Sequence, residues 1–174
     1  MERKRFEMSV DTRNITCFFT GHRTLDTKII QPLLRNEVER AYIAGYRYFG
    51  AGGAIGFDMI AAEEVLYAKQ KHTDIRLILV LPYPDYRNKW QPDDIERMDN
   101  IMRKADKIVY VRDFYTRDAY YARNRRMADY SSRCICYKTK DTGGTAYTLS
   151  YVERELVKKQ GYAYDIFNLV KNNS

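Results

Sequence analysis

The chain has 174 residues and a formal net charge of +7, with 45% hydrophobic and 30% charged residues. This length fits one domain that needs no disulfide or metal to fold, and the composition excludes collagen-like, low-complexity and disordered chains. The longest apolar run, residues 75–82, is too short to cross a membrane, and no signal peptide is visible. Three cysteines without an export signal predict reduced thiols in a cytoplasmic protein.

The first half of the chain alternates between short apolar runs and segments with helical periodicity. Apolar residues recur at helical spacing from Ile30 to Ala41 and from Phe57 to Gln70, which predicts two helices. The runs beside them are rich in β-branched and aromatic residues, which is typical of buried strands. The predicted strands span residues 15–20, 46–51 and 75–81.

The second half repeats this alternation. Helices are predicted over residues 93–105 and 119–130, and a last long helix carries Leu149 and Leu156 on one face before it ends at Gly161. Three further strands are predicted over residues 107–111, 134–137 and 162–169. The last of these is expected at a sheet edge.

Strands that alternate with helices of this length build βαβ units. The predicted fold class is therefore α/β, with a doubly wound, mostly parallel sheet flanked by helices. Residues 1–14 are expected to form an N-terminal extension, and residues 15–174 a single domain.

Glycines stand at three points where a predicted strand leads into a helix. At such carboxyl ends a phosphate can approach the backbone and the free N–H groups of the helix N-terminus. Asp58 either caps its helix or accepts hydrogen bonds from a ribose or a base, and Thr145 is both a predicted helix cap and a hydroxyl donor for a phosphate. The three turns are Thr20-Gly21-His22-Arg23, Gly52-Gly53-Ala54-Ile55-Gly56-Phe57-Asp58 and Gly143-Gly144-Thr145.

An arginine cluster and several aromatic residues complete the predicted site. Six arginines and three aspartates lie between Arg112 and Arg133, a pattern that fits either a phosphate-bearing partner or a solvated helix face. Arg123 is predicted to point toward the sheet edge from an exposed position, so that its removal leaves stability unchanged, and Asn124 lies beside it. Tyrosines such as Tyr83 and Tyr120 can stack on a base, although most of the 16 tyrosines are expected to pack.

Several other chemistries are not supported by the sequence. Cys17, Cys134, Cys136 and His22 match no zinc spacing, so the cysteines are expected in the core and no metal is expected. The chain contains neither G-x-S-x-G nor a Walker A sequence. Its second glycine turn has G-G-x-x-G spacing rather than the G-x-G-x-x-G of dinucleotide-binding domains.

These motifs together resemble the YpsA-like (DUF1273) family of the SLOG superfamily. The resemblance rests on the three glycine turns, on Arg123-Asn124, and on Leu79-Val80-Leu81-Pro82-Tyr83, and it runs from about Ile15 to about Glu155. It implies a Rossmann-like fold. The superfamily includes the LOG phosphoribohydrolases, the DNA-processing protein DprA, and sensor domains that bind ADP-ribose or NAD-related molecules.

The resemblance implies a predicted nucleotide-binding role rather than a known reaction. LOG enzymes carry P-G-G-x-G-T-x-x-E, and aligning its G-T with Gly144-Thr145 places Thr148 where the catalytic glutamate stands. No catalytic residue is therefore assigned, and Asp58 remains the acid that could serve.

The sequence thus predicts binding or sensing of a nucleotide or nucleotide sugar at the carboxyl edge of the sheet. An N-glycosidic hydrolase acting on a nucleoside monophosphate is the alternative, and DprA-like binding of single-stranded nucleic acid is the weaker one, because the positive charge is modest. No cofactor is required, nucleic acid and membrane are not expected as partners, and a homodimer, common among relatives, stays open. The predicted ligand-binding residues are Thr20, Gly21, His22, Arg23, Gly52, Gly53, Gly56, Asp58, Tyr83, Arg123, Asn124, Gly143, Gly144 and Thr145.

Overall fold

The computed structural model describes residues 10–170. Its centre is one six-stranded sheet in the order β4-β3-β2-β1-β5-β6, and every neighbouring pair is parallel. The first strand of the chain thus lies inside the sheet, and the chain winds outward from it in both directions. The strands are β1 (Thr16–Gly21), β2 (Tyr48–Ala51), β3 (Arg76–Leu81), β4 (Lys107–Tyr110), β5 (Arg133–Tyr137) and β6 (Asp165–Asn168).

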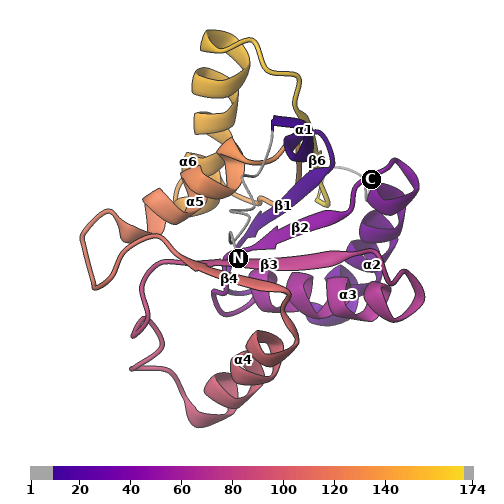
Figure 1. The fold of residues 1–174 in the computed structure, drawn as a ribbon. Helices are drawn as coiled ribbons and strands as arrows, with labels where there is room; N and C mark the ends of the chain where they lie inside the picture. The colour runs from indigo at the N-terminus through magenta and orange to yellow at the C-terminus, as the bar shows by residue number, and fades with distance from the viewer. Residues whose placement is uncertain (1–9, 171–174) are drawn as a thin grey trace, which may run out of the picture.

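Helices cover both faces of the sheet (Figure 1). One apolar cluster joins α2, α3 and α4 to the sheet, and a second joins α5 and the C-terminal helical segment to its opposite face. The helices are α1 (Val10–Arg13), α2 (Thr27–Ile43), α3 (Phe57–Lys71), α4 (Pro92–Lys104), α5 (Ala119–Asp129) and α6 (Gly144–Tyr151), which continues as the π-helix η1 (Val152–Lys159).

Alternation along β1 supplies both layers. Cys17 and Phe19 point into the cluster under α2 and α3, whereas Phe18 points into the cluster under α5 and α6. The side chains of all three residues are completely buried, which is expected for a strand in the middle of a parallel sheet.

The predicted fold class is confirmed, and each predicted strand and helix is present. The largest differences lie at the C-terminal end, where β6 is shorter than residues 162–169 and the last helix widens into a π-helix. The short helix α1 was not predicted. Most of the predicted N-terminal extension, residues 1–9, lies outside the described residues.

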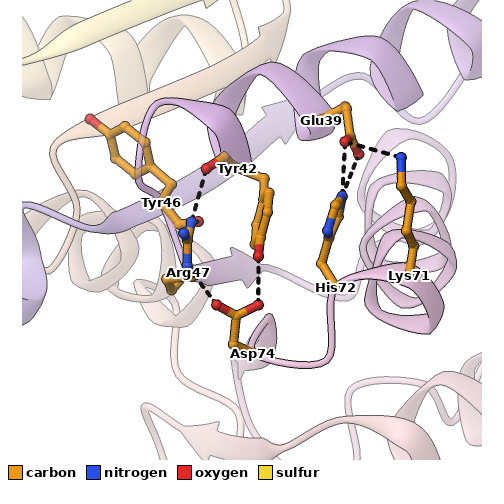
Figure 2. Close-up of polar contacts among 7 residues, drawn as sticks. All are labelled: Glu39, Tyr42, Tyr46, Arg47, Lys71, His72 and Asp74. Carbon is orange, nitrogen blue, oxygen red and sulfur yellow. Dashed lines mark hydrogen bonds and ion pairs between the residues drawn. The ribbon is translucent and has the colours of Figure 1, made fainter.

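A stack of polar side chains holds α2 to the turn before β3 (Figure 2). Tyr42 lies between Arg47 and His72, with the guanidinium 4.0 Å and the imidazole centroid 3.8 Å from its ring centroid. Its hydroxyl donates to Asp74 at 2.8 Å, and His72 Nε2 lies 2.8 Å from a carboxylate oxygen of Glu39. These contacts lie at the amino ends of β2 and β3, on the sheet edge opposite the predicted ligand site.

The cysteines are free and buried, as predicted. Cys17 lies on one side of the sheet, and Cys134 and Cys136 lie on the other. Residues 10–170 contain no cluster of three or more metal-ligating side chains, and none of their helices is long and apolar enough to cross a membrane.

Candidate functional site

The largest concentration of predicted site residues lines one pocket, with a volume of about 600 Å³. It opens at the carboxyl end of β1, beside the N-terminus of α6 and the inner face of α5. Ten of the fourteen predicted residues line it: Thr20, Gly21, His22, Arg23, Asp58, Arg123, Asn124, Gly143, Gly144 and Thr145.

The N-terminus of α6 forms one end of the pocket. Gly143 has φ +92°, and a side chain at this position would meet no protein atom within 4 Å. Beyond it, the first N–H groups of α6 have no acceptor within the helix and point out of its N-terminus, where an anion can accept them. Gly143 is itself the N-cap, so the prediction that Thr145 caps the helix was wrong; the Thr145 hydroxyl instead lies 3.5 Å from that of Thr20.

Asn124 presents an unused amide to this end. The Oδ1 atom accepts a hydrogen bond of 2.8 Å from Arg123 Nε, and since arginine only donates, this contact fixes the orientation of the amide. Its Nδ2 lies 3.8 Å from the position that a Cβ on Gly144 would take, and has no hydrogen-bond partner within residues 10–170. Asn124 as a whole is only 8% exposed, and its free Nδ2 lies beside the N-terminus of α6.

Arg123 is buried rather than exposed, which corrects the prediction of a surface position. Besides Asn124, its guanidinium donates to the backbone carbonyl of Gly52 through a short contact of Nη1. Only 6% of the residue is exposed, and burial lowers its pKa while Asp58 opposes the change. Arg123 therefore joins α5 to the end of β2 and forms part of the pocket wall.

Asp58 lies across Gly52 from this guanidinium. A Cβ on Gly52 would stand 2.8 Å from both Arg123 Nη1 and Asp58 Oδ2, so the two atoms are at most twice that distance apart. Asp58 Oδ2 also accepts a hydrogen bond of 3.2 Å from the backbone N–H of Ala54. Burial raises the pKa of Asp58, while Arg123, the Ala54 N–H and Arg23 oppose the increase.

His22 connects two of the loops that form the pocket. Its Nε2 accepts a hydrogen bond of 3.0 Å from the backbone N–H of Thr139, so this nitrogen is unprotonated and Nδ1 carries the proton. Burial lowers the pKa of His22, and the nearby Lys140 lowers it further. Both effects keep the imidazole neutral, so that Nε2 can accept the Thr139 N–H. This hydrogen bond joins the loop after β5 to the loop after β1.

Positive charge dominates the pocket. Arg23, Arg117 and Lys140 join Arg123 in the lining, and the first three form no ion pair with any residue in 10–170. Asp58 is the one acidic residue in the described lining. The site therefore favours a ligand with more than one negative charge.

The remaining predicted residues lie outside the lining. A Cβ on Gly53 would overlap Leu81 at 2.4 Å, and one on Gly56 would lie 2.1 Å from the carbonyl oxygen of Arg23. Tyr83 lies behind the lining residue Tyr120, with ring centroids 6.2 Å apart.

The distances from a Cβ at each glycine to the nearest protein atoms also correct the expectation that most of the glycines leave space for a phosphate. A Cβ on Gly21 would overlap the Phe57 ring at 2.4 Å, and Gly52 accommodates Arg123 and Asp58. Of the predicted glycines, only Gly143 and Gly144 have open space around them.

Eight lining residues were not predicted as ligand-binding. They include Arg117, Tyr120 and Tyr121 before and within α5, and Thr139 and Lys140 before α6. Two of them could have been found from the sequence: Arg117 belongs to the arginine cluster, and Lys140 lies close to Gly143 in the chain. Phe19, Thr24 and Ala54 complete this group.

Thr148 does not line the pocket. Its hydroxyl donates to the backbone carbonyl of Gly144 at 2.8 Å, and the residue is 1% exposed. The position that aligns with the LOG glutamate therefore contributes to the helix rather than to the site.

Comparison with known proteins gives a family and a fold. Residues 15–172 match the model of the YspA SLOG family. A UPF0398 protein of Brevibacillus brevis is 29% identical over 80 residues, which cover 46% of this chain and 43% of that protein. The uncharacterized SPbeta prophage-derived protein YoqJ of Bacillus subtilis is 24% identical over 144 residues, which cover 76% of this chain and 80% of YoqJ.

Two solved structures of DNA processing protein A (DprA) share the fold. The Streptococcus pneumoniae protein has a TM-score of 0.61 at 17% identity, covering 90% of this chain and 50% of DprA. The Helicobacter pylori protein, which binds single-stranded DNA, has a TM-score of 0.60 at 18% identity, covering 92% of this chain and 79% of that chain. The chain thus spans half of the pneumococcal protein and less than half of the Brevibacillus relative.

Proposed function

Because the chain belongs to the YspA SLOG family, we propose that its pocket binds a nucleotide or nucleotide sugar, as a binding or sensing module. The observation that carries this proposal is the unpaired side-chain NH₂ of the largely buried Asn124, beside the open N-terminus of α6. Helix N–H groups, a side-chain donor and a flexible lysine are a combination suited to phosphate.

The rest of the pocket suits the remainder of such a ligand. A volume of about 600 Å³ lies within the range of small-molecule sites. Tyr121, which is 44% exposed, offers an aromatic surface at the rim, where a base can stack. Arg23, Arg117 and Lys140 supply the charge for a second phosphate.

Calorimetry and thermal unfolding test the proposal with AMP, ADP, ADP-ribose and NAD. A ligand at a hundredfold excess over its Kd is expected to add about 2.7 kcal/mol to the free energy of unfolding. Lys140→Ala is expected to weaken binding, whereas Lys158→Ala, an exposed lysine outside the pocket, serves as the matched control. Absence of any shift with all four ligands would contradict the proposal.

Hydrolysis of an N-glycosidic bond is a second candidate, favoured by the raised pKa of Asp58 inside the pocket. It predicts release of free base from a nucleoside monophosphate and its loss in Asp58→Asn. We expect no such release, because Thr148 provides no carboxylate at the position of the LOG glutamate. Turnover near ordinary enzyme rates of ~10 per second would favour the hydrolase instead.

Binding of single-stranded nucleic acid is the third candidate, and the DprA fold is the observation that favours it. A short oligonucleotide in the same titrations distinguishes it from binding of a free nucleotide. Affinity that grows with oligonucleotide length and falls steeply with salt would favour a nucleic-acid site.

A further inference from the structure

Asp58 is the one acidic residue among the described residues that line the pocket. A site that binds only anions does not explain why a carboxylate lies there. Asp58 Oδ2 accepts a hydrogen bond from the Ala54 N–H, but Oδ1 has no hydrogen-bond partner within residues 10–170. The residue is 7% exposed and lines the pocket. Oδ1 is therefore an acceptor available to a ligand in the pocket, and a phosphate dianion has no donor to offer it.

Structural roles account for only part of this arrangement. Asp58 does not cap α3, because the N-cap is Gly56 and no side chain bonds there. Within the described chain it forms no direct ion pair with Arg123, which it faces across Gly52. The two charges attract each other, yet both residues line the pocket and each keeps unused hydrogen-bonding capacity.

The position of Asp58 favours contact with the sugar of a nucleotide. A continuous polar wall runs from the phosphate end to this carboxylate: Asn124 lies beside Gly144, Arg123 bonds Asn124, and Asp58 faces Arg123. The sugar is the group bonded directly to the phosphate. The lining residue Tyr120, whose ring centroid lies 5.6 Å from Arg123 Cζ, offers an aromatic ring near this sugar position.

We propose that this pocket selects ribonucleotides over deoxyribonucleotides, with Asp58 Oδ1 accepting a hydrogen bond from the 2′-hydroxyl of the sugar. The inference rests on the proposed function and narrows its ligand class. A 2′-deoxy sugar leaves Oδ1 without a donor. Since hydrogen bonds to charged groups are worth more than neutral ones, its loss is expected to weaken binding about tenfold or more.

Calorimetry on the full chain compares AMP with 2′-deoxy-AMP and ADP with 2′-deoxy-ADP. The wild-type protein is expected to prefer each ribonucleotide by about tenfold or more. In Asp58→Asn, the Ala54 N–H retains the amide oxygen and the NH₂ group takes the place of Oδ1. The preference is then expected to fall to within about twofold, because the acceptor is gone. Arg126→Ala, on the exposed side of α5, is expected to keep the full preference.

A second ligand series needs no variant and covers the case in which Asp58→Asn fails to fold. With the wild-type protein, 2′-O-methyl-AMP keeps the oxygen but lacks its hydrogen, and is expected to bind as weakly as 2′-deoxy-AMP. Equal binding of ribo and deoxy forms would overturn this inference and leave the proposed function intact. A full preference retained in Asp58→Asn would also overturn it. Binding of none of the four nucleotides would overturn it too, and the results with ADP-ribose and NAD would then decide the proposed function separately.

Discussion

Arg123 and Asp58 face each other across the backbone of Gly52, each 2.8 Å from the place where a side chain at that position would begin. One residue comes from α5 and the other from the first turn of α3, and β2 ends between them. Their charges compensate each other in a buried setting, where an isolated charge is costly. The wall of the pocket and part of the fold therefore depend on the same pair.

Arg123→Ala is expected to destabilise the protein as well as the site. It removes donors to the Gly52 carbonyl and to Asn124, and leaves the Asp58 carboxylate with Arg23 as the remaining cation that acts on it. We expect a loss of at least about 3 kcal/mol in the free energy of unfolding, measured by urea denaturation. Arg126→Ala, whose guanidinium lies 5.3 Å from the exposed Tyr130 ring, should change it by less than about 0.5 kcal/mol.

Combining Arg123→Ala with Asp58→Asn tests the pairing directly. Once Arg123 is absent, neutralising the carboxylate should recover part of the lost stability, because a buried charge that has lost this compensation disappears. Strictly additive losses would show that the two groups do not interact.

Gly52→Ala is expected to impair the pocket through sterics alone. The new Cβ would lie 2.8 Å from Arg123 Nη1 and Asp58 Oδ2, so at least one buried group must move. We expect ADP binding to weaken more than the matched change Gly50→Ala weakens it, since a Cβ on Gly50, in the strand that ends just before Gly52, meets its nearest atom at 3.6 Å. Calorimetry on both variants, at a temperature where each is folded, makes the comparison. Similar affinities in the two would contradict it.

The fold could be predicted because its signals are local. The apolar run of β3 and the helical spacing of α2 specify their own conformation, and their alternation specifies a parallel sheet. The burial of Arg123 could not be predicted in this way. Helical spacing places it on the same side of α5 as Arg126, yet only Arg123 meets the Gly52 turn, which comes from a segment far away in the sequence.

The role of each glycine in the site could not be predicted from the sequence either. In sequence, Gly21, Gly53 and Gly143 all follow or precede regular elements in the way that phosphate loops do. Only the structure distinguishes a glycine that accommodates a protein group, such as Phe57 beside Gly21, from one that leaves space open, such as Gly143. Both roles require a residue without a side chain, so both positions are glycine and the sequence alone does not distinguish them.

His22 is expected to make stability depend on pH. Its pKa is lowered in the folded protein by burial and by Lys140, so folding favours the neutral ring that accepts the Thr139 N–H. The stability it contributes is fully present above the unfolded pKa of about 6.5 and is lost as the pH falls through the lowered folded value. His22→Gln keeps an acceptor that does not titrate.

Thermal unfolding of both proteins from about pH 7.5 to about pH 5 provides the measurement. The melting temperature of the wild type should fall further on acidification than that of His22→Gln. The two proteins are otherwise identical, so the effects of all other groups cancel in the difference. Parallel curves would exclude a role for the contact between His22 and Thr139.

Lys140→Ala is expected to act on the ligand and on His22, with little effect on the fold. Lys140 is exposed, lines the pocket and forms no ion pair within residues 10–170, so the free energy of unfolding should change by less than about 0.5 kcal/mol. ADP binding should weaken several-fold at low salt and by a smaller factor at high salt, because the lost attraction is screened. Removing the ammonium group should also raise the pKa of His22, which NMR titration of the imidazole can follow. Lys158→Ala should change neither quantity, and an unchanged ADP affinity in Lys140→Ala would remove this lysine from the anion site.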